Sequence, residues 1–387
     1  MNDNDRLFWS ACFTEGYLNN KDTDELFDLR SIKDIKDLKD PNILADIGRS
    51  DISPKLRIKI EQIIKHYREL EYRSRIMAED IEALGVFTVT DTDDDYPEAW
   101  RSIRGMPRMI FCKGRRDILT GLKMGSCAVV GSREPGSYAS SATSEICEDL
   151  VKKDITIVSG MAKGIDRTAH KAALDNNGKT IAFLAGGPDN IYPWENKDIY
   201  DRIISEGLVI TEMPPGVKAQ RQFFPSRNRL ISAISDTCLI MEAGLHSGTL
   251  HTASFAAAQG KSVYVLPNTI YYENALGGLK LIQDGANILL SADDVINDIA
   301  ECCLYRMLDK GLDISHEAGD RKKEDLGEEE WKNVILNELS IKPQTSDMLA
   351  SRIELPFYRL SALLSELEMT GKVEQCRGKF LLTISRH

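Results

Sequence analysis

The chain has 387 residues, a formal net charge of −11, 42% hydrophobic and 28% charged residues, a profile typical of a globular protein rather than a disordered or fibrous one. No apolar run reaches the roughly 18 residues of a membrane span, and the opening MNDNDR lacks the pattern of a secretory signal. The eight cysteines include no CxxC pair, so the sequence favours neither a disulfide framework nor a zinc knuckle and predicts a location in the reducing cytoplasm.

The first part of the chain predicts a small, SAM-like all-helical domain over residues 1–84. Short helical segments, separated by Asp, Asn and Pro, lead into an amphipathic stretch from Pro54 to about Leu84 whose apolar residues recur at helical spacing. Residues 85–112 contain prolines that interrupt any longer element. We therefore expect these residues to form an irregular extension that packs on the next domain.

Residues 113–308 predict a doubly wound α/β domain with an extended Rossmann-like, mostly parallel sheet. Short apolar runs alternate with helical segments, which is typical of parallel strands covered by helices on both faces. The runs are residues 127–130, 155–159, 180–185, 208–211, 237–241 and 262–266. Because most runs end in glycine or another small residue, we expect the loops that follow them to form a ligand-binding edge of the sheet.

The end of the chain predicts a linker and a winged-helix domain. Residues 309–327 are charged and poor in apolar side chains, as linkers are. Residues 328–387 predict three helices and a β-hairpin with Arg377-Gly378 at its turn. This domain has eight basic and nine acidic residues, so we do not expect it to be a major DNA-reading module, which would need a basic recognition helix.

The loop after the first core strand is rich in glycine and begins at Gly131. It presents backbone N–H groups and Arg133 at the start of a helix, which suits an anion. It lacks the lysine of a P-loop and the spacing of a dinucleotide-binding loop. The loop alone does not distinguish a phosphate site from a tight turn.

A second glycine loop follows the next strand and contains Lys163 between Gly160 and Gly164. It is another candidate for binding an anion at the same edge of the sheet. Asp166 and His170 lie just beyond it, and we expect both to be structural rather than a general acid or base.

A basic segment extends from Met213 to Ser235 and contains no carboxylate. Its cations are Lys218, Arg221, Arg227 and Arg229. Phe223 and Phe224 lie among them, and arginines interleaved with aromatic rings suit single-stranded nucleic acid, whose phosphates bind guanidinium groups and whose bases stack on rings. The alternative is that the rings belong to the core, but the missing carboxylates favour a nucleic-acid site.

A third small-residue loop carries Ser247 and Thr249, whose hydroxyl groups can donate to phosphate. His246 and His251 are off a common helical face, so a metal pair is not expected. Spacing reveals neither a catalytic triad nor the carboxylates of a two-metal centre.

In order and spacing, these motifs resemble the DprA/Smf family of DNA-processing proteins. They are VVGSR, SGMAKGID, GGPDNIYP, EMPPG, FFPSRNRLI, EAGLHSGTLHTA and LIQDGAN, and the resemblance covers roughly residues 95–300.

The resemblance implies a homodimeric, cytoplasmic protein of natural transformation that binds single-stranded DNA, protects incoming strands and loads the RecA recombinase. It implies no cofactor, no metal and no catalytic turnover. Carried over by motif, the DNA-binding residues would be Gly131, Ser132, Arg133, Gly160, Lys163, Gly164, Arg221, Phe224, Arg227, Asn228, Arg229, Ser247, Gly248 and Thr249.

Two other functions stay open at this point. The first is a nucleotide-processing enzyme, such as a phosphoribohydrolase on a related Rossmann-like fold with a similar E-x-G-x-x-S/G-T sequence. The second is a transcription regulator that works through the winged helix. The acid-free FFPSRNR run at residues 223–229 is better explained by a polymeric ligand than by a mononucleotide.

Overall fold

The computed structural model describes residues 4–16, 18–27, 40–49, 52–311, 328–341, 346–353, 355, 357–376 and 379–382. The chain divides into two compact units, Met1–Cys303 and Leu304–His387. None of the helices within these described ranges is both long and apolar enough to cross a membrane.

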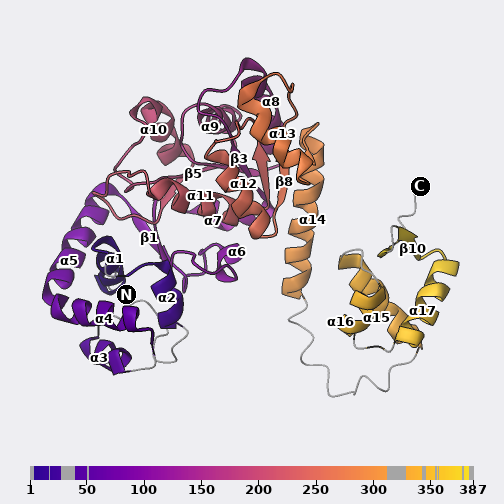
Figure 1. The fold of residues 1–387 in the computed structure, drawn as a ribbon, viewed down its shortest axis with the longest axis horizontal. Coiled ribbons are helices and arrows are strands. Elements are labelled where there is room, and N and C mark those ends of the chain that lie inside the picture. Colours follow the sequence, from indigo (N-terminus) through magenta and orange to yellow (C-terminus); the bar gives the residue numbers. More distant parts are fainter. Residues whose placement is uncertain are drawn as a thin grey trace. The chain divides into compact units, whose positions relative to one another are not determined.

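A nine-stranded sheet forms the centre of the first unit (Figure 1). Its strands are β1 (Phe87–Thr90), β2 (Met109–Gly114), β3 (Ser126–Val130), β4 (Thr156–Ser159), β5 (Thr180–Phe183), β6 (Leu208–Thr211), β7 (Thr237–Ile240), β8 (Ser262–Val265) and β9 (Asn287–Ile288). Their order is β1-β2-β6-β5-β4-β3-β7-β8-β9, and the strands from β3 onward pair in parallel. Because the order reverses between β3 and β7, the predicted doubly wound sheet is confirmed, with its switch point at the carboxyl ends of those two strands.

Helices cover both faces of this sheet. They are α8 (Ser137–Lys152), α9 (Ile165–Asp175), α10 (Lys197–Glu206), α11 (Phe223–Ile234), α12 (Thr249–Ala258), α13 (Leu276–Gln283) and α14 (Ala292–Gly311), with short 3-10 turns η3 (Trp194–Asn196) and η4 (Glu273–Ala275). Side chains alternate between the faces of a strand, so Val129 packs with Leu150 of α8 while Val130 packs with Leu230 of α11. With both faces covered, the carboxyl edge is where the connecting loops gather.

The extension before the parallel strands adds two strands to the sheet. It comprises β1, α6 (Glu98–Arg101), β2, α7 (Asp117–Gly121) and η2 (Leu122–Met124). β2 is antiparallel to β6, with Phe111 opposite Thr211. The prediction of an irregular segment misses β1 and β2, because the prolines Pro97 and Pro107 lie in the connection between the two strands and interrupt neither.

The N-terminal helices form a separate hydrophobic cluster that rests on one face of β2. They are α1 (Asn4–Thr14), α2 (Asn20–Phe27), α3 (Pro41–Arg49), α4 (Pro54–Lys65) and α5 (Tyr67–Leu84). Phe8 and Leu56 belong to this cluster together with Phe111. The predicted long amphipathic stretch is two helices, because the backbone leaves helical geometry at His66, where φ is −102° and ψ is 15°.

The second unit has the element order predicted for a winged helix. Its elements are α15 (Glu328–Ile341), α16 (Ser346–Ile353), α17 (Phe357–Met369), β10 (Val373–Cys376) and β11 (Lys379–Leu382). β10 and β11 form the predicted antiparallel hairpin. The predicted turn residues Arg377-Gly378 lie outside the described residues, as does most of the predicted linker (312–327).

Candidate nucleic-acid interface

The loops at the carboxyl edge of the sheet are tied to one another by hydrogen bonds. Ile165 N donates to Ser132 O (3.1 Å), which joins the second glycine loop to the first. Thr249 Oγ1 donates to Gly131 O (3.1 Å), so the loop after β7 is fixed to the same place. Ala219 N donates to Asn190 Oδ1 (2.9 Å), which joins the loops after β5 and β6. Asn196 Nδ2 donates to Met161 O (2.8 Å), which joins the segment after β5 to the second glycine loop, so the motifs lie on one connected surface.

The predicted glycines allow these loops to approach closely. A Cβ atom on Gly131 would lie 2.6 Å from Cγ1 of Ile165, and one on Gly164 would lie 2.7 Å from the carbonyl oxygen of Arg133. Gly164 also has φ +72°, a conformation that favours glycine. A Cβ on Gly160 would collide with the guanidinium group of Arg227. These three glycines shape the surface through their backbones.

Beneath this surface, a buried ionic cluster joins α11 to the second glycine loop. Arg227 is 5% exposed and its Nη1 donates to the carbonyl oxygens of Gly160 and Phe183. Its Nε donates to Asn228 Oδ1 (3.1 Å). Asp166, which is 6% exposed, accepts from the N–H groups of Gly160 (3.1 Å) and Ala162 (3.2 Å). Arg227, one of the predicted DNA contacts, is therefore placed in the protein interior.

The two charges of this cluster shift each other's pKa. Burial raises the pKa of Asp166, and the nearby Arg227 opposes that rise. Burial lowers the pKa of Arg227 to about 10, so the guanidinium group stays protonated at neutral pH. The result is a fixed internal cation held by main-chain carbonyls, which positions the loop after β4.

His170 lies close to this cluster and has a structural environment. The hydroxyl of Thr180 donates to Ile157 O (2.9 Å), so His170 Nδ1, 2.7 Å away, must be the donor of their shared hydrogen bond. Burial lowers the pKa of His170 to about 3, and the imidazole is neutral at physiological pH. This geometry agrees with the expectation that His170 is not a general acid or base.

Arg229 joins α11 to the end of β6 and to the extension. Its Nη2 lies 2.6 Å from Glu212 Oε2, and its Nη1 lies 3.5 Å from Met106 Sδ. The side chain is partly buried. Arg229 is therefore in an ion pair with Glu212, directly after β6. The structure does not bring it together with the exposed cations Arg133, Lys163 and Arg221.

The exposed part of the predicted site centres on Phe224 at the start of α11. Its partly buried ring lies 5.7 Å from the guanidinium carbon of Arg133 and 5.8 Å from that of Arg227. The Tyr192 ring contacts it edge to face at 5.7 Å and is 53% exposed. Arg133 is exposed, as is Arg221 on the loop that leads to α11. Phe224 is thus a partly exposed ring between an exposed cation, Arg133, and a buried one, Arg227.

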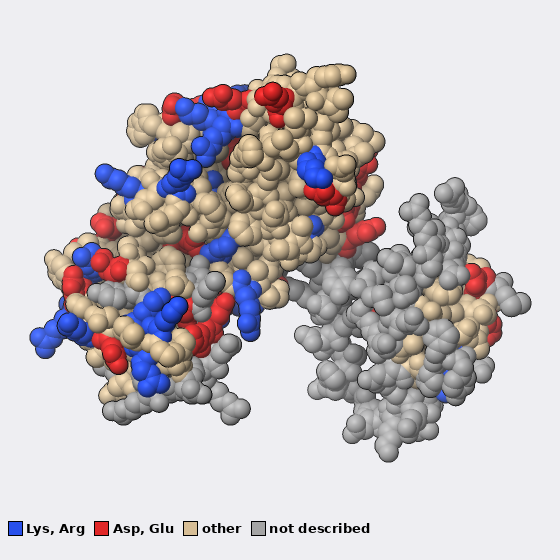
Figure 2. All heavy atoms as spheres, viewed as in Figure 1, with Lys and Arg blue, Asp and Glu red and all other residues tan. Residues whose placement is uncertain are grey.

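Lys163 extends the basic surface towards α10. Its Nζ lies 2.5 Å from Glu195 Oε1, and both side chains are exposed. Trp194, next to Glu195, is 66% exposed, and Lys197 Nζ lies 5.9 Å from its ring centroid. Figure 2 shows basic side chains gathered over α9 and α10, with acidic residues among them. Tyr192 and Trp194 were not predicted as site residues, although aromatic residues on either side of a proline after a glycine-rich loop are a signal for such a role.

The switch point itself is occupied by a glutamate. Glu242 is buried, and its Oε2 accepts from Gly136 N (3.0 Å) at the start of α8. Ser247 Oγ donates to Thr249 Oγ1 (3.0 Å) and accepts from Thr249 N (3.2 Å), so these hydroxyls already bond within their loop, while Gly248 is exposed. An acidic group at the first helix start disfavours a phosphate there.

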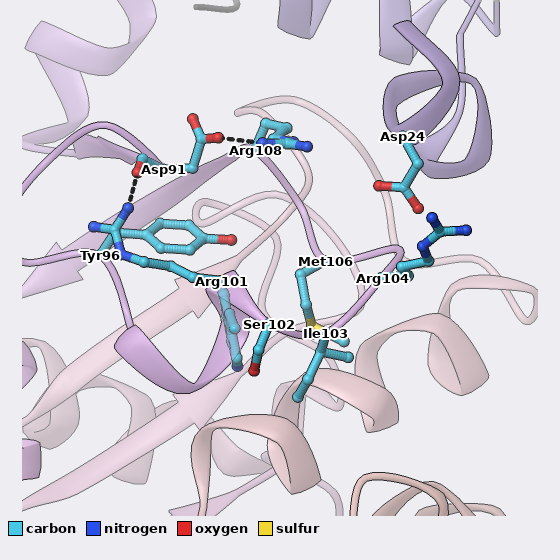
Figure 3. Close-up of a pocket in the computed structure, with 10 residues that line it drawn as sticks. Asp24, Asp91, Tyr96, Arg101, Ser102, Ile103, Arg104, Met106 and Arg108 are labelled. Atoms are coloured by element: carbon cyan, nitrogen blue, oxygen red, sulfur yellow. Dashed lines mark hydrogen bonds and ion pairs between the residues drawn. The ribbon is translucent and has the colours of Figure 1, made fainter. Parts of the chain in front are cut away.

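A separate pocket of about 240 Å³ lies between α2 and the extension (Figure 3). It is lined by Asp24, Asp91, Tyr96, Trp100, Arg101, Ser102, Ile103, Arg104, Met106 and Arg108. Arg101 donates to the main-chain carbonyl of Asp91, and Arg108 Nη1 lies 2.6 Å from the Asp91 carboxylate. The Asp91 carboxylate therefore balances the charge of Arg108. Over the described ranges, no cluster of three His, Cys, Asp or Glu side chains has the arrangement of a metal site.

Comparison with known proteins identifies two matching family models. The family described as DNA recombination-mediator protein A matches residues 87–300. The DprA winged helix domain matches residues 324–379. The first match covers the extension and the α/β domain, and the second covers the predicted winged helix.

Curated relatives and solved structures agree with these matches. Protein Smf of Synechocystis sp. is 34% identical over 314 residues, covering 75% of this chain and 78% of the relative. DNA processing protein DprA of Bacillus subtilis is 35% identical over 218 residues, covering 56% of this chain and 72% of the relative. The crystal structure of DprA from Streptococcus pneumoniae has a TM-score of 0.61 and 30% identity, covering 75% of this chain and 96% of that one.

A structure of DNA processing protein A from Helicobacter pylori, described for its single-stranded DNA binding mode, has a TM-score of 0.50 and 28% identity. The match covers 56% of this chain and 96% of that one.

Proposed function

This chain belongs to the DNA recombination-mediator protein A family, the DprA/Smf DNA-processing proteins, and from that premise we propose that it binds single-stranded DNA at the carboxyl edge of its sheet. There it serves natural transformation in the cytoplasm as a recombination mediator that protects incoming strands and loads the RecA recombinase. Its role is binding rather than catalytic turnover.

One observation carries the DNA-binding proposal: the exposed Arg133 lies over a partly exposed aromatic ring, Phe224, on loops that are fixed to one another. Phe224 lies beside Arg133 and Tyr192, and Lys163 and Arg221 are exposed nearby on the same edge. Cations that follow a phosphate backbone and rings that stack on bases are the two requirements of single-strand binding. The single-stranded DNA described for the Helicobacter pylori relative supports the same ligand class.

The predicted site residues form three groups in this proposal: residues that contact DNA, residues that position them, and loop residues that complete the surface. Arg133, Lys163 and Arg221 contact phosphates, and Phe224 contacts a base. Residues with buried or internal bonds position those contacts, and the loop backbones and hydroxyls complete the surface. The positioning residues are Arg227, Asn228 and Arg229, and the loop residues are Gly131, Ser132, Gly160, Gly164, Ser247, Gly248 and Thr249.

The proposed function predicts salt-dependent binding that prefers single strands to duplex. The exposed cations Arg133, Lys163, Lys218 and Arg221 correspond to about four phosphate contacts, and each contributes roughly −0.7 to the slope of log affinity against log salt, for a slope near −3. Fluorescence anisotropy of labelled single-stranded and duplex oligonucleotides at several salt concentrations measures both quantities. Tighter binding to duplex than to single strands would contradict the proposal.

A matched pair of variants locates these contacts. Arg133→Ala removes one phosphate contact and should make the salt slope shallower by about 0.7. Lys171→Ala removes an exposed lysine of α9 that pairs with Asp175 within its own helix, so it should leave both slope and affinity unchanged. Equal effects of the two substitutions would indicate a diffuse electrostatic attraction in place of a site at the loops.

Thermal unfolding in the presence of nucleotides distinguishes the proposed function from the alternative of a nucleotide-processing enzyme. A protein that binds a mononucleotide in its folded state is stabilised by it. We expect ATP, NAD and nucleoside monophosphates to leave Tm unchanged in thermal unfolding, because Glu242 already occupies the N–H group at Gly136 and the P-loop lysine is missing. A clear rise in Tm with ATP, or release of free base from a monophosphate, would favour the enzyme.

We also propose that the protein acts as a homodimer and that the winged helix contacts protein rather than reading DNA. Exposed large apolar side chains support self-association: Ile270 and Tyr271 lie in the loop between β8 and η4, and Leu290 lies just after β9. In the winged helix, Glu366 of α17 lies 2.6 Å from Lys332. This helix carries two glutamates and one arginine, and a third helix that is not basic supports a role other than binding phosphate.

A further inference from the structure

Trp194 exposes a large aromatic surface beside the proposed DNA site. It is 66% exposed at the start of η3, directly after Pro193 and before α10. Burying a tryptophan against a ligand removes a large apolar area from water, whereas an exposed ring contributes little to folding. Its exposure therefore adds a flat apolar surface to the loop after β5.

An adjacent aromatic side chain connects Trp194 with the proposed site. Tyr192, two residues earlier, is 53% exposed and contacts Phe224 at 5.7 Å between ring centroids. The loop that carries both residues is fixed to the loop leading into α11, because Asn190 accepts from Ala219 and Gly187 N donates to Val217 O (2.7 Å). Aromatic surface thus continues from Phe224 through Tyr192 into the segment that holds Trp194.

The charges around Trp194 are compatible with a polyanion. Lys197 Nζ lies 5.9 Å from the Trp194 ring, and Lys163 Nζ lies 2.5 Å from Glu195. The nearby carboxylates have basic partners: Glu195 pairs with Lys163, Asp198 with Arg167 at 2.6 Å, and Asp201 with Lys197. The hydrogen bond from Lys163 lowers the pKa of Glu195. Exposed ion pairs are worth little, so these lysines can turn to a phosphate at small cost.

We propose that Trp194 is a second base-stacking subsite, which binds another nucleobase of the DNA strand that contacts Phe224. This inference rests on the proposed function, and it extends the path of the bound DNA strand from α11 towards α10. Lys163 and Lys197 contact the phosphates on either side of the stacked base. Stacking on a ring is tolerant of sequence because every base has a π-face, so this subsite adds affinity without base preference.

Tryptophan fluorescence isolates this subsite because the other three tryptophans are buried. Trp9, Trp100 and Trp331 are 4%, 1% and 4% exposed. Addition of an unlabelled oligothymidylate to the full-length protein should quench the tryptophan emission and protect it from acrylamide. Trp194→Phe should abolish both changes while still binding labelled DNA. Trp194→Ala should weaken binding by about five- to tenfold with an unchanged salt slope, since no charge is removed.

A control and two contrary outcomes complete the test. Tyr72→Ala removes an exposed ring from α5, in the helical domain, and should bind as wild type. If labelled DNA binds the wild type but emission is unchanged, or if Trp194→Ala binds as tightly as wild type, the second subsite is wrong and the proposed function stands. If labelled single-stranded DNA does not bind the wild type at all, the proposed function fails, and the subsite fails with it.

Discussion

Arg227→Ala is expected to lower the free energy of unfolding by about 3–5 kcal/mol, because it leaves a buried carboxylate without the nearby buried cation that stabilises its charge. The substitution leaves the Asp166 carboxylate buried without its cation and removes the donor that Gly160 O and Phe183 O share. Urea denaturation followed by circular dichroism at neutral pH measures the loss. A variant as stable as wild type would show that the buried arginine contributes no net stability.

A double variant distinguishes the charge pair from simple loss of packing. Asp166→Asn keeps an oxygen that can accept from the N–H groups of Gly160 and Ala162 but carries no charge. Combined with Arg227→Met, which fills the same space without charge, it should recover much of the stability lost in Arg227→Ala. If the double variant is less stable than the single one, the carboxylate is not what makes Arg227 necessary.

The pH dependence of the stability lost in Arg227→Ala gives an independent check that the Asp166 charge causes the loss. Burial already raises the folded-state pKa of Asp166 above its ordinary value, and removing Arg227 raises it further. A carboxyl group with a raised folded-state pKa costs stability as pH increases through the interval between its unfolded and folded pKa values. The difference in free energy of unfolding between wild type and Arg227→Ala should therefore be larger at pH 7.5 than at pH 5.

The parallel strands could be predicted because strands buried on both faces appear in sequence as short continuous apolar runs. The runs at 127–130 and 208–211 became β3 and β6 with almost the same bounds. β2 carries the same signal, because Met109–Cys112 is a continuous apolar run whose side chains face two hydrophobic clusters. The prolines that precede it, Pro97 and Pro107, obscured this signal in the sequence.

The candidate site was predicted from the residue types in one segment of the chain, arginines and aromatics without carboxylates. The structure shows that some of these residues are buried and others are exposed. Arg227 lies three, four and seven residues before the buried Leu230, Ile231 and Ile234, which puts it on the inner face of α11. That spacing was a signal in the sequence, whereas the carboxylate that balances the arginine comes from α9 and could not be inferred. Arg229 pairs with Glu212, which lies immediately before the acid-free segment.

Phe224→Ala is expected to weaken single-strand binding by about 1–3 kcal/mol, or roughly five- to 150-fold, because one stacked base is lost. The effect should be largest at this ring, since it also orders the exposed Arg133 at 5.7 Å. The salt slope should stay close to the wild-type value, because the substitution removes no charge. Anisotropy titrations at several salt concentrations separate this behaviour from that of Arg133→Ala, which makes the slope shallower.

Phe224→Leu is the matched control for folding, because it keeps apolar volume at a partly buried position on the first turn of α11. It should unfold at nearly the wild-type denaturant concentration and still bind as weakly as Phe224→Ala, since leucine presents no π-face to a base. Phe224→Tyr keeps the ring and should restore most of the affinity. Wild-type affinity in a stable Phe224→Leu protein would mean that the ring only packs against Tyr192 and Arg227, and that the bases stack elsewhere on the surface.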